Sequence, residues 1–392
     1  MMHRLREGYK QTKVGVIPEE WEVVRLGDVG NLVGGGTPST ENTQFWQGNI
    51  PWISSSDLIE ESIYTVNKHR FITDTAIMES ATKKIPKNSV LIVSRVGVGK
   101  VAINDEELCV SQDFQCLIPK QSNTLFLAYL IKEKTKLLIA FNQGTSIKGF
   151  VKNDLKSLKI PLPPLKEQQK IAQILSTWDS VISKQETLIK AKEQLKKGLM
   201  QKLLSGEVRF EGVDGEWEFT RLGDLLDYLQ PTPYLVANKE YDDSYTIPVL
   251  TAGKTFILGY TKEENGIFKD DLPVIIFDDF TTATKFVDFP FKAKSSAMKI
   301  LKAKDDTVNV KLVFEMMQMI NYEADDHKRY WISEFQEIEI KLPSSKEQQK
   351  IAQVLTTADK ELELLKEELE MLKEQKRGLM QRLLSGDVRV VV

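Results

Sequence analysis

The chain has 392 residues, of which 41 % are hydrophobic and 28 % charged, with a formal net charge of −3 and two cysteines, Cys109 and Cys116. This length favours two or three folded domains, and the composition excludes global disorder and a disulfide framework; the cysteines are expected to be reduced core thiols. The polar stretch Met1–Lys10 and the lack of an apolar run of ~18 residues exclude a signal peptide and a membrane span, so we expect a cytoplasmic protein.

The chain opens with a short lead, Trp21-Glu22 followed by Arg25-Leu26-Gly27-Asp28, and continues into a segment that we call X, residues 28–157. In X, Val90–Val93 is typical of a buried strand and Leu125–Ile139 of a helix. Between such elements lie loops rich in glycine, small polar residues and single cations, which suit contacts with DNA phosphates and base edges, although plain turns have the same composition. The candidate DNA-contacting residues in X are Gly36, Thr37, Ser39, Ser54, Ser94, Arg95, Gln143 and Lys148.

A long helix is predicted after the prolines at positions 161, 163 and 164 and before Ser205-Gly206. Its apolar residues follow a coiled-coil seam. They are Leu175, Trp178, Ile182, Ile189, Leu199 and Leu203, with Val181, Leu188 and Leu195 expected to widen the stripe. At roughly 40 residues, the helix should be about 60 Å long.

A second lead, Trp217-Glu218 followed by Arg221-Leu222-Gly223-Asp224, precedes a segment that we call Y, residues 224–337. Val274–Phe277 is again typical of a buried strand. Y contains 13 Lys and Arg against 20 Asp and Glu, whereas X contains 14 against 13. If Y binds DNA, its cations must therefore be concentrated on one face. The candidate DNA-contacting residues in Y are Thr251, Lys254, Thr281, Thr282, Lys285, Lys294 and Ser295.

The last segment predicts a second long helix, after Pro343-Ser344 and before Ser385-Gly386. Its seam is Leu355, Ala358, Leu362, Leu365, Leu369, Leu372, Leu379 and Leu383. Residues 166–173 recur unchanged at 346–353 and residues 196–209 recur nearly unchanged at 376–389, both at an offset of 180, while the leads recur at an offset of 196. The chain thus has the order lead–X–helix–lead–Y–helix, although X and Y do not resemble each other.

This duplication predicts an α+β fold with a pseudo-twofold internal repeat, in which two globular α/β domains are separated by two long antiparallel coiled-coil helices. The predicted boundaries are 1–157 for the first domain, 158–210 for the central helix, 211–337 for the second domain and 338–392 for the C-terminal helix. Two alternatives are a tandem duplication in which one copy has drifted, and helices that only complete the core of each domain.

Two segments resemble enzyme motifs but lack residues that those motifs require. Gly97-Val98-Gly99-Lys100 has neither the glycine spacing nor the following Ser or Thr of a P-loop, and Pro163-Pro164 lacks the flanking residues of an amino-methyltransferase motif. We therefore predict a chain without an active site or a metal site. The competing hypotheses are a self-sufficient methyltransferase or nuclease and a coiled-coil scaffold that does not bind DNA.

The repeated helix start, Pro163-Pro164-Leu165-Lys166-Glu167-Gln168-Gln169-Lys170-Ile171, and the helix end Lys197-Gly198-Leu199-Met200-Gln201 resemble those of specificity (S) subunits of type I restriction–modification enzymes. The first lead, Gly35–Ser39 and Ile50-Pro51-Trp52 are similar to the start of a target-recognition domain of that family. Y has Gln230-Pro231-Thr232-Pro233 in place of the glycine-rich stretch, so its contacting loops are less well defined.

The resemblance implies that X and Y each read one half of a bipartite DNA site and that the helices set the spacing. It also implies partners: double-stranded DNA, two methyltransferase (M) subunits docked on the helices, and motor–nuclease (R) subunits held through M. The M subunits would carry S-adenosylmethionine and methylate adenine N6 after flipping the base, and the R subunits would use ATP and magnesium. This chain would bind no cofactor. The alternative is a related system with a fused methyltransferase–nuclease partner.

Overall fold

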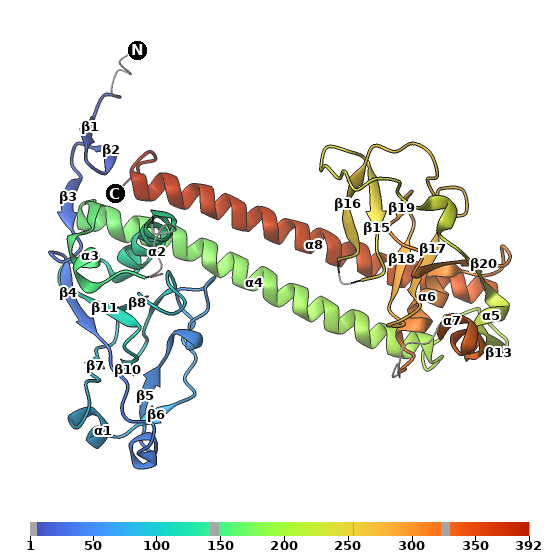
Figure 1. Cartoon of the computed structure of the whole chain (residues 1–392), viewed down its shortest axis with the longest axis horizontal. Helices are drawn as coiled ribbons and strands as arrows, with labels where there is room; N and C mark the ends of the chain where they lie inside the picture. Colours follow the sequence, from blue (N-terminus) through green and yellow to red (C-terminus); the bar gives the residue numbers. More distant parts are fainter. Residues whose placement is uncertain (1–5, 142–148, 254, 323–329, 392) are drawn as a thin grey trace. The chain divides into compact units, whose positions relative to one another are not determined.

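A computed structural model describes residues 6–141, 149–253, 255–322 and 330–391. The chain forms two compact units: unit 1 comprises residues 1–184 and 369–392, and unit 2 comprises residues 185–368. Each unit contains one mixed α/β module and parts of two long helices, α4 (Leu165–Leu204) and α8 (Ser345–Ser385) (Figure 1). The predicted α+β fold with two globular modules and two long helices is confirmed. No described helix is long and apolar enough to cross a membrane.

The module of unit 1 contains two four-stranded sheets. The antiparallel sheet has the order β4 (Gly30–Gly34), β11 (Phe114–Pro119), β8 (Val90–Val93) and β9 (Val101–Ile103). The second sheet has the order β6 (Phe71–Ile72), β5 (Ile50–Ile53), β10 (Leu108–Val110) and β7 (Lys84–Ile85), and its β5–β10 pair is parallel. The remaining elements are the hairpin β1 (Tyr9–Thr12) and β2 (Gly15–Pro18), the pair β3 (Glu22–Arg25) and β12 (Lys159–Leu162), and the helices α1 (Asp74–Met78), α2 (Thr124–Phe141) and α3 (Lys152–Ser157).

The module of unit 2 repeats the order of the whole antiparallel sheet and of three strands of the second sheet, despite its different sequence. Its antiparallel sheet runs β14 (Leu226–Leu229), β20 (Met298–Ala303), β17 (Val274–Asp278) and β18 (Thr284–Val287). Its second sheet runs β16 (Ile257–Thr261), β15 (Ile247–Leu250) and β19 (Lys292–Ala293), again with one parallel pair, β15–β19. It also contains the pair β13 (Glu218–Arg221) and β21 (Glu339–Leu342), and the helices α5 (Leu222–Leu225), α6 (Val310–Gln318) and α7 (Tyr330–Ser333).

The central strands β8 and β17 explain the continuous apolar runs in X and Y. In β8, Val90 and Ile92 belong to the core beneath α2, whereas Leu91 and Val93 belong to the core shared with the second sheet. The run Val274–Phe277 of β17 alternates between two cores in the same way. A strand that is buried on both faces has no polar face, so its sequence is apolar throughout.

The long helices begin and end where their flanking residues predict. α4 starts directly after Pro164, and Gly206 and Gly386, just beyond the ends of α4 and α8, have φ angles of +73° and +82°. Glycine adopts this left-handed conformation without a steric penalty, which suits a helix C-cap. The seam residues are buried or half-buried, but the prediction that Val181, Leu188 and Leu195 widen the stripe is wrong, because all three are exposed on the outer face of α4.

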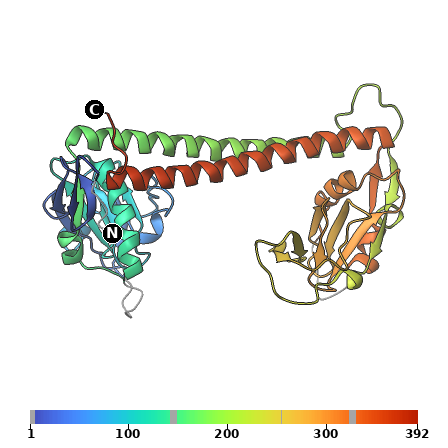
Figure 2. The ribbon, with the colours of Figure 1, turned by 90° about the horizontal axis from the view of Figure 1, so that it is seen from above.

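Within each unit, α4 and α8 lie side by side and run in opposite directions (Figures 1 and 2). In unit 2 the side chain of Gln185 donates to Glu368, Lys192 pairs with Glu361, and Lys196 pairs with Asp359. In unit 1, Lys376 pairs with Asp179, which is the pair related to Lys196–Asp359 by the offset of 180. The antiparallel arrangement and the internal repeat are therefore present in the contacts themselves.

A buried carboxylate in the first turn of each long helix connects three segments, an arrangement that we call a lock. In unit 1, Glu167 is 1 % exposed and accepts from Trp21 Nε1 at 2.9 Å and from Arg389 Nε at 2.9 Å. In unit 2, Glu347 accepts from Trp217 Nε1 at 3.1 Å and from Arg209 Nη2 at 2.7 Å. The helix N-terminus adds a favourable dipole to the arginine charge.

We call the paired helices α4 and α8 the frame. The glutamine after each lock carboxylate attaches one helix of the module, α2 in unit 1 and α6 in unit 2, to this frame. Gln168 donates to Pro163 O at 2.8 Å and accepts from Asn123 N at 2.9 Å, at the start of α2. Gln348 makes the corresponding bonds to Pro343 O and Asn309 N at 3.1 Å each, at the start of α6. The repeated Glu-Gln dipeptide is therefore buried for structural reasons.

The frame pairs Asp179–Lys376 and Asp359–Lys196 also contact the module helices, but with different partners. In unit 1, Tyr129 of α2 donates to Asp179, and the surrounding burial, with the nearby carboxylate, raises the pKa of Tyr129. In unit 2, Lys311 of α6 lies 2.7 Å from Asp359 and 2.6 Å from Glu315. Burial opposes the charge on Lys311, but the two carboxylates raise its pKa overall.

We expect Arg209→Met to lower the unfolding free energy of unit 2 by more than the control below, because the buried Glu347 carboxylate loses its counter-charge. Urea unfolding followed by circular dichroism measures this loss. Adding Glu347→Gln to Arg209→Met should restore part of it. The control Lys202→Met removes an exposed cation from the same end of α4 and should change stability by less than about 0.5 kcal/mol. Equal stability of Arg209→Met and Lys202→Met would contradict the role of the lock.

Candidate nucleic-acid interface

One edge of the antiparallel sheet in unit 1 collects most of the loops predicted to contact DNA. The strand register places the end of β4 beside the start of β11, and the end of β8 beside both the start of β11 and the start of β9. The parallel strands β5 and β10 end side by side, and the turns that follow them reach the same edge. We call the segments 35–39, 54–57, 94–100 and 111–113 the loop edge of unit 1.

Hydrogen bonds tie these segments to one another. Thr37 Oγ1 donates to the Gln112 side chain, Gly36 N donates to Val110 O at 2.9 Å, and Gly36 O accepts from Trp52 Nε1 at 2.9 Å. Ser94 N donates to Asp113 O at 2.8 Å. The structure thus brings together residues that are up to 76 positions apart in the sequence, from Thr37 to Asp113.

The predicted residues at this edge divide into buried and exposed groups. Gly36 and Ser94 are buried, and a Cβ on Gly36 would lie 2.6 Å from the Ala81–Thr82 backbone, so the glycine is required by packing. Thr37, Ser39 and Arg95 are exposed. Contact with DNA through these three side chains stays a prediction, and Gly36 and Ser94 shape the loops that carry them.

Two cations at this edge hold loops in place, and sequence reasoning did not assign them this role. Lys100 Nζ donates to Ser55 O at 3.2 Å and Leu58 O at 2.8 Å. The Arg70 guanidinium lies over the Trp52 ring at 4.7 Å and donates to Ser54 Oγ and Asp57 Oδ2 at 2.5 Å each. The only sequence signal for Arg70 is its charge, because its position relative to residues 54–57 depends on the β5–β6 pairing.

Unit 2 presents a corresponding loop edge, formed by segments 251–253, 255–256, 279–283 and 294–297 after β15, β17 and β19. Thr281 Oγ1 donates to Asp278 Oδ2 at 2.8 Å, and Thr251 Oγ1 donates to Thr255 O at 2.6 Å. Ser295 is exposed, and its Oγ accepts from Ala297 N. Thr282 has a φ of +59°, which is rare for a β-branched residue.

The lysines of unit 2 fall into two classes. Lys292 and Lys299 are buried and pair with Glu263 at 3.1 Å and Asp279 at 3.7 Å. Although partial burial opposes it, hydrogen bonds from Ala237 N, Asn238 N and Lys292 lower the pKa of Glu263, so the charge of Lys292 is neutralised internally. Lys285 is exposed, and Lys294 is half-buried and donates to Tyr241 Oη at 2.9 Å. These two lysines supply cationic charge to the loop edge.

Three predicted contact residues, Gln143, Lys148 and Lys254, lie outside the described residues. The two modules nevertheless share an anchor next to such a segment. Phe150 N donates to Ser94 O at 3.0 Å, and Tyr330 N donates to Asp279 O at 3.3 Å. In each module, the chain that follows the module helix therefore rejoins the described structure at the loop edge.

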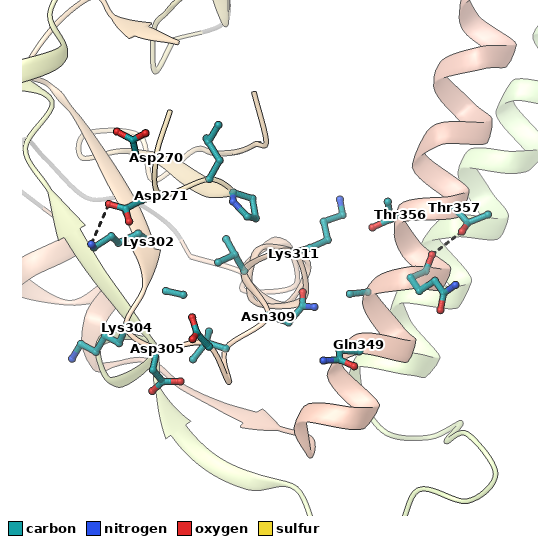
Figure 3. A pocket seen from close by; sticks show the side chains of 18 of the residues that line it. Asp270, Asp271, Lys302, Lys304, Asp305, Asn309, Lys311, Gln349, Thr356 and Thr357 are labelled. Atoms are coloured by element: carbon teal, nitrogen blue, oxygen red, sulfur yellow. Dashed lines mark hydrogen bonds and ion pairs between the residues drawn. The ribbon is translucent and has the colours of Figure 1, made fainter. Parts of the chain in front are cut away.

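A cavity of about 1000 Å³ lies at the opposite edge of the unit 2 sheet, between the module and the first half of α8 (Figure 3). Its lining mixes both signs of charge, and Lys302 pairs with Asp271 at 3.3 Å. Asp305 and Asp306 also line it. Such a mixed lining does not favour a polyanion, and several acids of Y are thus held away from the loop edge.

The described residues include no group of three or more His, Cys, Asp or Glu side chains arranged to hold a metal ion. Both cysteines are buried and unpaired, as predicted. Burial raises the pKa of Cys109 to about 11, so its thiol stays protonated near neutral pH.

Comparison with known proteins identifies the family. The profile of the type I restriction modification DNA specificity domain matches residues 18–194 and again residues 214–374, which together make up most of the chain. The chain therefore belongs to this family.

Two relatives are named as specificity subunits. The EcoR124I/EcoR124II specificity subunit of Escherichia coli is 52 % identical over 35 % of this chain and 34 % of that protein. The MjaIX specificity subunit of Methanocaldococcus jannaschii is 35 % identical over 56 % of this chain and 54 % of that protein. The chain thus matches about a third and about half of the length of these relatives. A type I S subunit structure from M. genitalium has the same fold, with a TM-score of 0.63 at 18 % identity over 97 % of this chain and 98 % of that one.

We expect Arg70→Met to increase amide hydrogen exchange across Ser54–Asp57, because the buried Asp57 carboxylate loses its cationic partner, at a cost of about 1–3 kcal/mol in stability. Lys68→Met is the matched control: Lys68 pairs with the more exposed Asp105 and Glu106, so its loss should cost less than about 1 kcal/mol. Unchanged exchange in Arg70→Met would show that this arginine does not hold the turn.

Proposed function

We propose that this chain is the DNA sequence-specificity subunit of a type I restriction–modification complex, in which each module reads one half of a bipartite DNA site. The observation that best supports this is the pair of loop edges. The same strand order presents Thr37 and Arg95 in unit 1 but Thr281, Lys285 and Lys294 in unit 2. Two copies of one scaffold with different surface chemistry suit two readers of different sequences.

On this proposal the chain has no catalytic role. Two M subunits hold S-adenosylmethionine and methylate adenine, R subunits join through M with ATP and magnesium, and the long helices set the gap between the half-sites. The complex acts on DNA in the cytoplasm. Identical residues at the surface of both helix starts support two copies of one partner: Lys166, Gln169 and Gln173 recur as Lys346, Gln349 and Gln353. The two relatives are named as type I subunits, which favours separate M and R partners over a fused one.

Methylation mapping tests the proposal directly. In a host that carries this gene and its M partner, we expect methylated adenines within a motif of two short half-sites separated by unread base pairs. Replacing residues 224–337 by the corresponding segment of another family member should change only one half-site, because unit 1 keeps its own loops. A single continuous motif would contradict the two-reader architecture.

Arg95 and Lys100 lie in the same loop, and comparing them distinguishes a DNA contact from a structural role. We expect Arg95→Ala to weaken DNA binding by the assembled complex, either lowering the slope of log K against log salt by about one, as for a lost phosphate contact, or relaxing the preference at one base pair. Lys100→Met should leave the slope unchanged, because Lys100 already donates to Ser55 O and Leu58 O. Equal slope changes in both variants would contradict these assignments.

A further inference from the structure

An exposed aromatic side chain stands at the loop edge of unit 2, where the candidate contacts are otherwise polar. Phe280 lies in the loop that joins β17 to β18 and is 50 % exposed. It is followed by Thr281 and Thr282, and Lys285 lies close by in β18. The ring is therefore accessible to a ligand at the candidate interface, and covering it would be favourable.

The loop that carries Phe280 is fixed by its own hydrogen bonds. Phe280 N donates to Asp278 Oδ1 at 3.0 Å, Thr282 N donates to Asp278 O at 2.9 Å, and Asp278 N donates to Ala283 O at 2.8 Å. Thr282 is held in the left-handed backbone region. Asp279, which directly precedes Phe280, is buried and connects the loop to Lys299 and Trp331 N. Hydrogen bonds of this kind fix the backbone of the loop and so the direction in which the Phe280 side chain leaves it.

The geometry points to Phe280 as a base-contacting residue that packs against the 5-methyl group of a thymine in the major groove. This inference rests on the proposed function, that the module reads DNA. The loop between β17 and β18 lies at an end of the four-stranded sheet, and thymine is the base that presents a methyl group in the major groove. Phenylalanine makes an apolar contact with that methyl group and has no hydrogen bond to offer any other base edge.

The corresponding hairpin in unit 1 supports a reading role for this position. The loop between β8 and β9 carries Arg95, which is exposed, and Val96, which is 69 % exposed. Both modules therefore place an exposed side chain in the loop of the same hairpin, yet the chemistry of the two side chains differs. An arginine suits guanine and a phenylalanine suits thymine, so the tip distinguishes the two half-sites.

A uracil-for-thymine scan tests the inference. The complex with the M partner is titrated against duplexes that carry its mapped methylation motif, with each thymine of the unit 2 half-site replaced in turn by deoxyuridine, which removes only the methyl group. We expect wild type to lose affinity about fourfold at one position, the effect of burying one methyl group. Phe280→Ala should bind the thymine duplex more weakly and bind the thymine and uracil duplexes equally.

The matched control is Phe219→Ala, which removes another exposed phenylalanine of unit 2, located on β13 and not in a loop-edge segment. It should keep the fourfold discrimination between thymine and uracil. If wild type binds sequence-specifically but shows no uracil effect at any position, the Phe280 inference alone is overturned. The same holds if Phe280→Ala binds more weakly while wild type shows no uracil effect. Absence of sequence-specific binding by wild type would overturn the proposed function as well.

Discussion

Each unit depends on a carboxylate that is buried at the start of a long helix. Glu167 and Glu347 are both 1 % exposed, and a buried charge without a partner costs several kcal/mol, roughly the stability of a small domain. The compensating arginines, Arg389 and Arg209, come from the segment that follows the end of the other long helix. The lock therefore favours the observed pairing of the two helices in a unit, because it gives each buried carboxylate a counter-charge.

Sequence reasoning predicted this frame well because its signals are local. The alternating spacing of three and four residues identifies the seam, and proline and glycine mark the helix ends. The lock itself was not predicted, since Arg389 lies 222 residues from Glu167. A signal existed, however: both residues fall within the repeated segments, which suggests that they serve one structure twice. The exposed Val181 shows the limit of periodicity: the spacing places a residue next to the apolar stripe of α4 but does not show how much of that surface α8 covers.

The candidate interface was predictable in composition but not in orientation. The glycine-rich loop was interpreted as one that allows close approach of DNA, whereas Gly36 is buried against the protein backbone. Ser94 and Lys100 are likewise engaged within the module. Residue type shows what a loop side chain can do, but the strand pairing decides whether it points outward. The strand order that X and Y share could not be predicted from the sequence, because it depends on pairing between short strands that are far apart along the chain.

Within each unit, the attachment to the long helices and the candidate contact loops occupy opposite edges of one sheet. Gln168 and Gln348 hold the module helices at the edge away from the loops, so loop residues can change without disturbing the frame. Where the module helix contacts the long helices, the residues of the two units differ in charge. Where unit 1 uses the neutral hydroxyl of Tyr129, unit 2 has the carboxylate of Glu315, and Lys311 is present to offset it. At this contact the two modules of the chain thus differ by a charge-balanced pair, Glu315 and Lys311, in the place of one neutral side chain.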